Sequence, residues 1–116
     1  MRAAALLAAL LALAVPASAG ATPARVQVVA KEFSLALSRP WVKAGPAVVE
    51  LANFGEDPHD LRLQRIGGTR VYGTPIVRPG GVYDLSLRLQ PGRYRLWCSL
   101  GDHRARGMVT TLVVRS

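Results

Sequence analysis

The fold is decided by residues 91–114, which read PGRYRLWCSLGDHRARGMVTTLVV. Pro91-Gly92 is a turn signal, and the residues after it alternate in character with a period of two, as in a half-buried strand. Tyr94, Leu96 and Cys98 share one face of this strand, and Arg93, Arg95 and Trp97 share the other. A second strand is expected at Met108–Val114, so the stretch predicts two strands joined by a loop that begins at a cysteine.

Outward from this stretch, short β-branched and apolar runs recur between Gly and Pro residues, a pattern typical of an all-β sandwich. Strands are expected at Arg25–Ala30, Phe33–Leu37, Ala47–Asn53, Asp60–Ile66, Val71–Val77, Val82–Leu89, Arg93–Cys98 and Met108–Val114. No helix is expected after residue 20. Alternation in the strand Val82–Leu89 predicts that the side chains of Tyr83, Leu85, Leu87 and Leu89 are buried.

The N-terminus has the features of a signal peptide. Met1-Arg2 is followed by an apolar run from Ala3 to Val15, and Ala17-Ser18-Ala19 supplies a small-x-small cleavage pattern. The run is shorter than the roughly 20 residues that a membrane-spanning helix needs, although an uncleaved anchor stays the alternative. We therefore expect a signal peptide at 1–19, a single domain at 20–116 without a transmembrane segment, and a periplasmic or secreted protein.

The charge and the cysteine count limit the classes of function. The formal net charge is +8, but the basic residues are scattered singly, which argues against a nucleic-acid partner. The chain has one Cys and therefore no internal disulfide. An unpaired Cys in an exported protein is expected to be buried, joined to another chain or bound to a metal.

The loop after Cys98 carries three candidate metal ligands, Cys98, His103 and Met108, in the spacing Cys-x4-His-x4-Met. Thiolate and thioether suit Cu(I), and two His with one Cys and a weak axial Met form the blue-copper arrangement. His59, the only other histidine, begins an expected strand and supplies the second imidazole. Zinc is disfavoured because it does not take thioether ligands.

Each ligand has an alternative interpretation when taken alone. Cys98 could be a small buried hydrophobe, His59 a polar surface residue and Met108 a core residue. The combination of the four, in this order and with these neighbours, is what predicts a copper site.

The chain resembles the plastocyanin/azurin family of cupredoxins over the whole domain. The resemblance is carried by Asn53, Gly55, Pro58 and His59, by the Pro91-Gly92-x-Tyr94 approach to Cys98, and by Gly107-Met108. It implies an eight-stranded Greek-key sandwich with one copper near one end and a partly exposed His103 through which electrons pass. Two departures from many relatives are Asp60 in place of Asn and Gly101-Asp102 in place of Pro-Gly.

The predicted function is that of an exported type 1 copper protein that carries single electrons and is not an enzyme. A copper chaperone or storage protein with the same ligands is the alternative. The expected partners are redox proteins with an acidic docking surface, since Arg104 and Arg106 flank His103 and Trp97 lies among basic residues. No nucleic acid and no substrate is expected.

Overall fold

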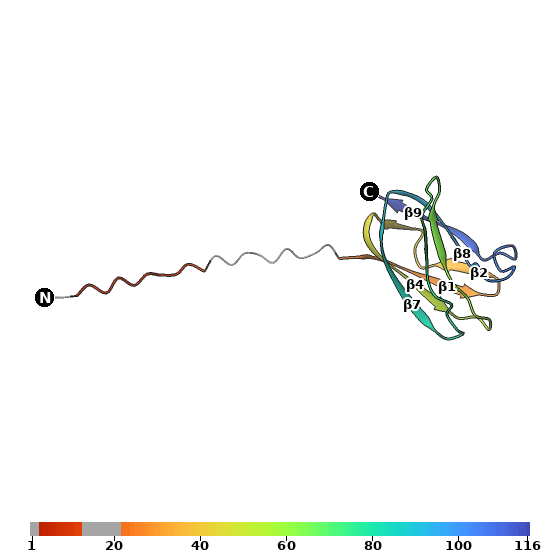
Figure 1. Cartoon of the computed structure of the whole chain (residues 1–116), viewed down its shortest axis with the longest axis horizontal. Helices are drawn as coiled ribbons and strands as arrows, with labels where there is room; N and C mark the ends of the chain where they lie inside the picture. The colour runs from red at the N-terminus through yellow and green to blue at the C-terminus, as the bar shows by residue number, and fades with distance from the viewer. Residues whose placement is uncertain (1–2, 13–21) are drawn as a thin grey trace.

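The computed structural model describes residues 3–12 and 22–116. Residues 24–115 form two β-sheets that pack face to face (Figure 1). None of the described residues belongs to a helix that is long and apolar enough to cross a membrane. The expected cleavage point after Ala19 lies outside the described residues.

The first sheet has four strands in the order β2, β1, β4, β7. These strands are β1 (Ala24–Lys31), β2 (Ser34–Leu37), β4 (Gly45–Asn53) and β7 (Val82–Leu89). β1 runs parallel to β4, so both strands end on the same side of the sheet, with Ala30 opposite Asn53. The turn after β1 and the loop after β4 therefore lie at the same end of the sandwich.

The second sheet has five strands in the order β3, β9, β8, β5, β6. These strands are β3 (Trp41–Lys43), β5 (Arg62–Arg65), β6 (Val71–Gly73), β8 (Gly92–Trp97) and β9 (Val109–Arg115). β8 and β9 are antiparallel, with Trp97 opposite Val109. The loop 98–108 joins them at the end of the sandwich where β8 stops.

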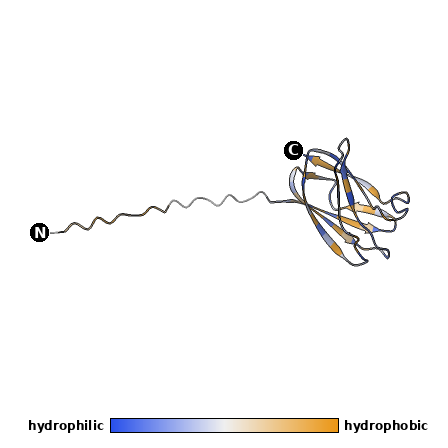
Figure 2. Cartoon of the chain, in the orientation of Figure 1, coloured by the Kyte–Doolittle hydropathy of each residue, from blue (hydrophilic) through white to orange (hydrophobic). Residues whose placement is uncertain are grey.

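The core lies between the sheets, and hydrophobic residues alternate with hydrophilic ones along the strands (Figure 2). Val28, Val49 and Leu51 from the first sheet and Leu63 and Leu96 from the second are fully buried. Truncating such a leucine to alanine costs about 2–5 kcal/mol, because a cavity remains where the side chain was. This packing holds the ends of the strands, and the loops that follow them, in fixed positions.

The all-β sandwich is confirmed, with nine strands instead of eight. The unexpected strand is β3, whose three residues lie between Arg39-Pro40 and Gly45-Pro46 and pair in parallel with β9. Two expected strands, Asp60–Ile66 and Val71–Val77, are shorter in the structure. His59 and Val77 instead form an isolated bridge.

The prediction that Tyr83 is buried was wrong, since 39% of it is exposed. Tyr83 lies opposite the buried Leu51, so it is on the inward-facing side of the strand, as expected. However, β7 is an edge strand of its sheet, and the adjacent Val82 is also exposed. Leu89 at the other end of the strand is buried, and Leu85 and Leu87 are partly buried against the core.

Candidate metal centre

His59 is positioned by the loop that leaves β4. Asn53, the last residue of β4, donates from Nδ2 to the carbonyls of Asp57 and Val77, at 2.8 and 2.9 Å. Its Oδ1 accepts the N–H of Gly55. The backbone of His59 is bonded to that of Val77 in both directions. These contacts fix the loop at both ends, so the fully buried His59 ring is held against the end of the core.

Cys98, His103 and Met108 are tied together by the backbone of their own loop. The N–H of Cys98, which directly follows β8, donates to the carbonyl of Met108 at 3.1 Å. The N–H of Met108 donates to the carbonyl of His103 at 3.0 Å. Cys98 and Met108 are both fully buried. A short loop closed in this way presents its donor groups to one region at the end of the sandwich.

Three donor atoms converge at this end of the sandwich. His59 Nδ1 lies 3.2 Å from His103 Nδ1, and Cys98 Sγ lies 3.9 Å from the first nitrogen and 3.6 Å from the second. The circumradius of a triangle with these sides is about 2.1 Å, close to the bond lengths of about 2.0–2.3 Å that nitrogen and sulfur ligands make to zinc. The three atoms therefore fit a single metal ion. Met108 is buried in the core, and its carbonyl accepts the N–H of Cys98.

Glu32 holds the far side of the His59 ring. Its Oε1 lies 2.9 Å from His59 Nε2 and accepts the N–H of Asp57 at 2.7 Å, and both carboxylate oxygens accept the N–H of Glu56 at 3.0 Å. These bonds, from Asp57 first and Glu56 next, lower the pKa of Glu32 to about 2. An ionised carboxylate at Nε2 requires that His59 carries its proton there, which leaves Nδ1 free to bind a metal.

A second carboxylate, Asp60, joins the two ligand loops. It accepts hydrogen bonds from the N–H and the hydroxyl of Ser99, the residue after Cys98. The guanidinium of Arg62 lies 3.4 Å from the same carboxylate, which is 2% exposed. In these two bonds Asp60 is the acceptor, and Ser99 supplies the donors that link the loops.

His103 lies at the rim of the site, with 15% of its side chain exposed. Its ring meets the edge of Phe33 at 5.4 Å between centroids, and the guanidinium of Arg106 covers the Phe33 ring at 3.9 Å. On the inner side, burial raises the pKa of the Cys98 thiol, so a metal must displace a firmly held proton. The site is closed on the core side and reaches solvent on the His103 side.

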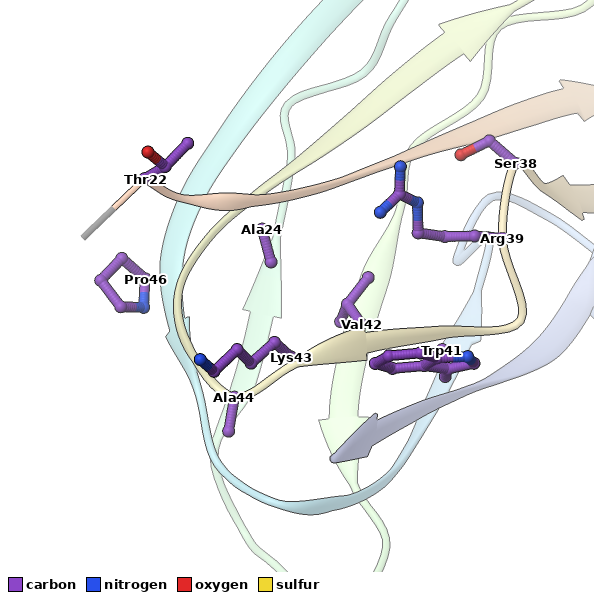
Figure 3. A pocket seen from close by; sticks show the side chains of 9 residues that line it. All are labelled: Thr22, Ala24, Ser38, Arg39, Trp41, Val42, Lys43, Ala44 and Pro46. Atoms are coloured by element: carbon purple, nitrogen blue, oxygen red, sulfur yellow. The ribbon is translucent and has the colours of Figure 1, made fainter. Parts of the chain in front are cut away.

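The structure brings three of the four predicted ligands within bonding reach of one point and buries the fourth, Met108, whose backbone is bonded to Cys98. Glu32 and Ser99 were not among the residues predicted from the sequence. A single acid in a turn, or a serine after a cysteine, gives no sequence signal that separates it from other polar residues. Figure 3 shows a surface pocket lined in part by Arg39, Trp41 and Lys43. It lies at the other end of the sandwich from these ligands, because Lys43 pairs with Arg115 at the far end of β9 from Met108.

Comparisons with known proteins identify the fold. No family model and no curated protein sequence matches the chain. The solved structure of a reduced auracyanin from Roseiflexus castenholzii matches with a TM-score of 0.65 and 17% identity, over 84% of this chain and 100% of that chain. Auracyanin A, described as a "blue" copper protein from Chloroflexus aurantiacus, matches with a TM-score of 0.65 and 13% identity, over 81% of this chain and 100% of that one.

A purple cupredoxin from Nitrosopumilus maritimus matches with a TM-score of 0.56 and 18% identity, over 77% of this chain and 98% of that chain. At these identities the likeness is one of fold. The chain has the cupredoxin fold, which confirms the fold implied by its motifs.

Proposed function

We propose that this chain is an exported type 1 copper protein that binds one copper through His59, Cys98, His103 and Met108 and carries single electrons between redox proteins. The observation that carries the proposal is the convergence of two imidazole nitrogens and one thiol sulfur, 3.2 to 3.9 Å apart. Solved proteins of the same fold include one whose description calls it a "blue" copper protein.

The donor set favours copper over zinc. Two imidazoles, one thiolate and a thioether form the trigonal site with a weak axial ligand that is characteristic of blue copper. Structural zinc sites use four Cys, His or carboxylate ligands. Each of the three carboxylates near the site faces another group: Glu32 is bonded to His59 Nε2 and Asp60 to Ser99, and Asp57 lies 4.0 Å from His103 Nε2, on the side of that ring away from the other donors. Met108 is then the fourth donor.

The surroundings of the site favour electron transfer over catalysis. Bound copper would supply a one-electron couple, and the chain would hold it with four protein donors and no position for a substrate. Both histidines and the only cysteine are used by this single site. The hydrogen bonds of Asn53, Glu32 and Asp60 hold the ligand loops in place, so little rearrangement would accompany a change of oxidation state.

The apolar run Ala3–Val15 and the Ala17-Ser18-Ala19 pattern support export to the periplasm or the exterior. The same ligands would also serve a copper chaperone or storage protein. A carrier should exchange electrons rapidly and keep its copper, whereas a chaperone should release copper to a metal-free acceptor.

The proposal is tested by adding Cu(II) to the protein lacking residues 1–19 and recording visible and electron paramagnetic resonance spectra. One equivalent should bind and produce an intense thiolate-to-copper charge-transfer band. Cys98→Ser should abolish the band, and Ser99→Ala, which leaves the ligands intact, should keep it. A band that survives in Cys98→Ser would show that Cys98 is not a ligand.

A further inference from the structure

The two sheets of the sandwich differ sharply in charge. The strands of the five-stranded sheet carry six basic residues and no acidic one: Lys43, Arg62, Arg65, Arg93, Arg95 and Arg115. The strands of the four-stranded sheet carry three basic and two acidic residues: Arg25, Lys31, Arg88, Glu50 and Asp84. This segregation is not explained by the metal site.

Most basic side chains of the five-stranded sheet lie on its outer face. Arg65 is the exception, because it pairs with the buried Tyr94 and its Nε donates to the carbonyl of Pro91. Arg93 and Arg95 alternate with buried Tyr94 and Leu96, so they point away from the core and are exposed. Arg93 lies opposite Val113 of β9, and Val113 lies opposite Trp41 of β3. A row of outward positions therefore crosses β8, β9 and β3. Lys43, the last residue of β3, lies opposite Arg115 of β9.

The basic side chains of the five-stranded sheet have few acidic partners within the described chain. On the four-stranded sheet, Arg25 lies 4.0 Å from Glu50 and 3.7 Å from Asp84. On the five-stranded sheet, the ion pair found among the described residues is that of Arg62 with Asp60, at the edge near the metal ligands. The outer face of this sheet thus presents uncompensated positive charge.

Aromatic side chains lie among the cations and hold some of them in place. The guanidinium of Arg115 stacks over Trp41 at 4.6 Å from the ring centroid, and that of Arg104 stacks over Trp97 at 4.8 Å. A shallow pocket on this side is lined by Gln64, Arg65, Arg95 and Arg104 together with the turn 66–68. Arginine and tryptophan are enriched in protein interfaces, and a stacked guanidinium keeps its edge free for a carboxylate.

The same face borders the metal ligands. Trp97 directly precedes Cys98, and Val109, which lies opposite Trp97, directly follows Met108. A protein bound to this face would contact residues adjacent in the chain to two of the four ligands. The face is therefore near enough to the site to serve its exchange of electrons.

We propose that the outer face of the five-stranded sheet, centred on Arg93, Arg95 and Trp97, is the docking surface for an acidic protein, the redox partner. The identification of that partner as a redox protein rests on the proposed function. At strand spacings of about 4.8 Å and a rise of about 3.3 Å per residue, five strands present roughly 400 Å². An interface of that size matches the weak encounters of electron-transfer proteins, which bury less than about 1,200 Å² in total.

An anionic membrane is the competing occupant, and the composition of the face argues against it. Binding at a membrane surface draws on apolar side chains that enter the acyl boundary. Val71, Val109 and a Trp41 stacked under Arg115 are the exposed large apolar residues of these five strands. Charge complementarity with carboxylates is the stronger attraction on this face.

The test is a titration with poly-L-glutamate followed by amide nitrogen–proton NMR, on the protein lacking residues 1–19 with and without added Cu(I). The chemical-shift changes caused by polyglutamate should be largest in β5, β8 and β9. They should become smaller as added salt shortens the screening length, to about 8 Å near 0.15 M. Since binding to polyglutamate needs no metal, a chain that fails to bind copper can still show docking. Failure of the proposed function and failure of this inference are thereby separated.

Two matched charge reversals give the decisive comparison. Arg95→Glu and Arg88→Glu each change the net charge by two units at an exposed strand position, but on opposite sheets. Arg95→Glu should weaken binding by about fivefold or more, and Arg88→Glu by less than about twofold. Arg93→Glu replaces Arg95→Glu if the latter does not fold.

Three results would overturn the inference. Equal weakening by the two reversals would mean that net charge alone attracts the polymer. Shifts confined to the loop around His103 would place docking there. Binding of vesicles made of equal parts phosphatidylglycerol and phosphatidylcholine, without binding of polyglutamate, would favour the membrane.

Discussion

Replacing Glu32 by glutamine isolates the effect of one charge on the proposed copper site. The amide side chain of the Glu32→Gln variant keeps a carbonyl oxygen able to accept from His59 Nε2 and from the N–H of Asp57, so the ring orientation should survive. What is lost is the negative charge. A negative charge near copper favours Cu(II) over Cu(I), so Glu32→Gln should raise the reduction potential.

The size of the shift follows from the geometry. The carboxylate oxygen lies 2.9 Å from Nε2, and the ring with one metal–nitrogen bond places the charge roughly 6 to 7 Å from a metal at Nδ1. Coulomb's law then gives about 30 mV at the dielectric constant of water and about 110 mV at an effective value of 20. Because Glu32 is partly exposed, the shift should lie toward the lower value.

The measurement is the reduction potential by voltammetry, with copper retention followed by competition with a chelator. Glu32→Ala removes the hydrogen bond as well as the charge and should also weaken metal binding, by about 10- to 100-fold. Glu50→Gln is the control, since it makes the same change in net charge on the outer face of the four-stranded sheet. If Glu32→Gln moves the potential no further than Glu50→Gln, Glu32 does not tune the site.

Three further predictions concern the candidate ligands, Glu32 and a glycine of the ligand loop. Met108→Gln should keep copper and lower the reduction potential, because a weak axial ligand affects the potential more than it affects copper affinity. His59→Ala should lose copper, and equal copper loss from the two variants in a chelator competition would contradict this ranking. The lowered pKa of Glu32, about 2 against 4.5 ordinarily, stabilises the fold above pH 4.5. Thermal unfolding of the metal-free protein should therefore show that its stability falls between about pH 4.5 and pH 2, and that this fall is smaller in Glu32→Gln. Parallel pH dependences for the two proteins would refute a stabilising role of the Glu32 charge. Gly107 has φ +126°, and an added Cβ would lie 2.7 Å from the Phe33 carbonyl, whereas Gly45 has φ +112° and open space. Gly45→Ala should lower the free energy of unfolding by about 1–2 kcal/mol, from backbone strain alone. Gly107→Ala should lower it further, as measured by chemical denaturation, because its added Cβ also meets the Phe33 carbonyl.

The sequence allows the sandwich to be predicted because the fold depends on local patterns, and the same patterns single out a candidate ligand set. Period-two alternation identified Leu96 and Cys98 as inward residues, and both are fully buried. The scarcity of His, Cys and Met left little choice among candidate ligands. The exposure of Tyr83 could not be predicted in the same way. It depends on β7 being the edge strand of its sheet, which local alternation does not reveal.

The carboxylate on His59 shows why the rest of the site could not be predicted. Glu32 and His59 are far apart in the sequence, and nothing in the residues around Glu32 marks it as a partner. Their contact follows from the parallel pairing of β1 with β4, which sets Ala30 opposite Asn53. With that register, the turn after β1 meets the loop after β4, and the N–H groups of Glu56 and Asp57 face the carboxylate. An antiparallel pairing of the same two strands would place Glu32 at the other end of β4, away from His59. The candidate ligands can thus be read from the sequence, whereas the carboxylate that lies against His59 is brought there by the order and direction of the strands.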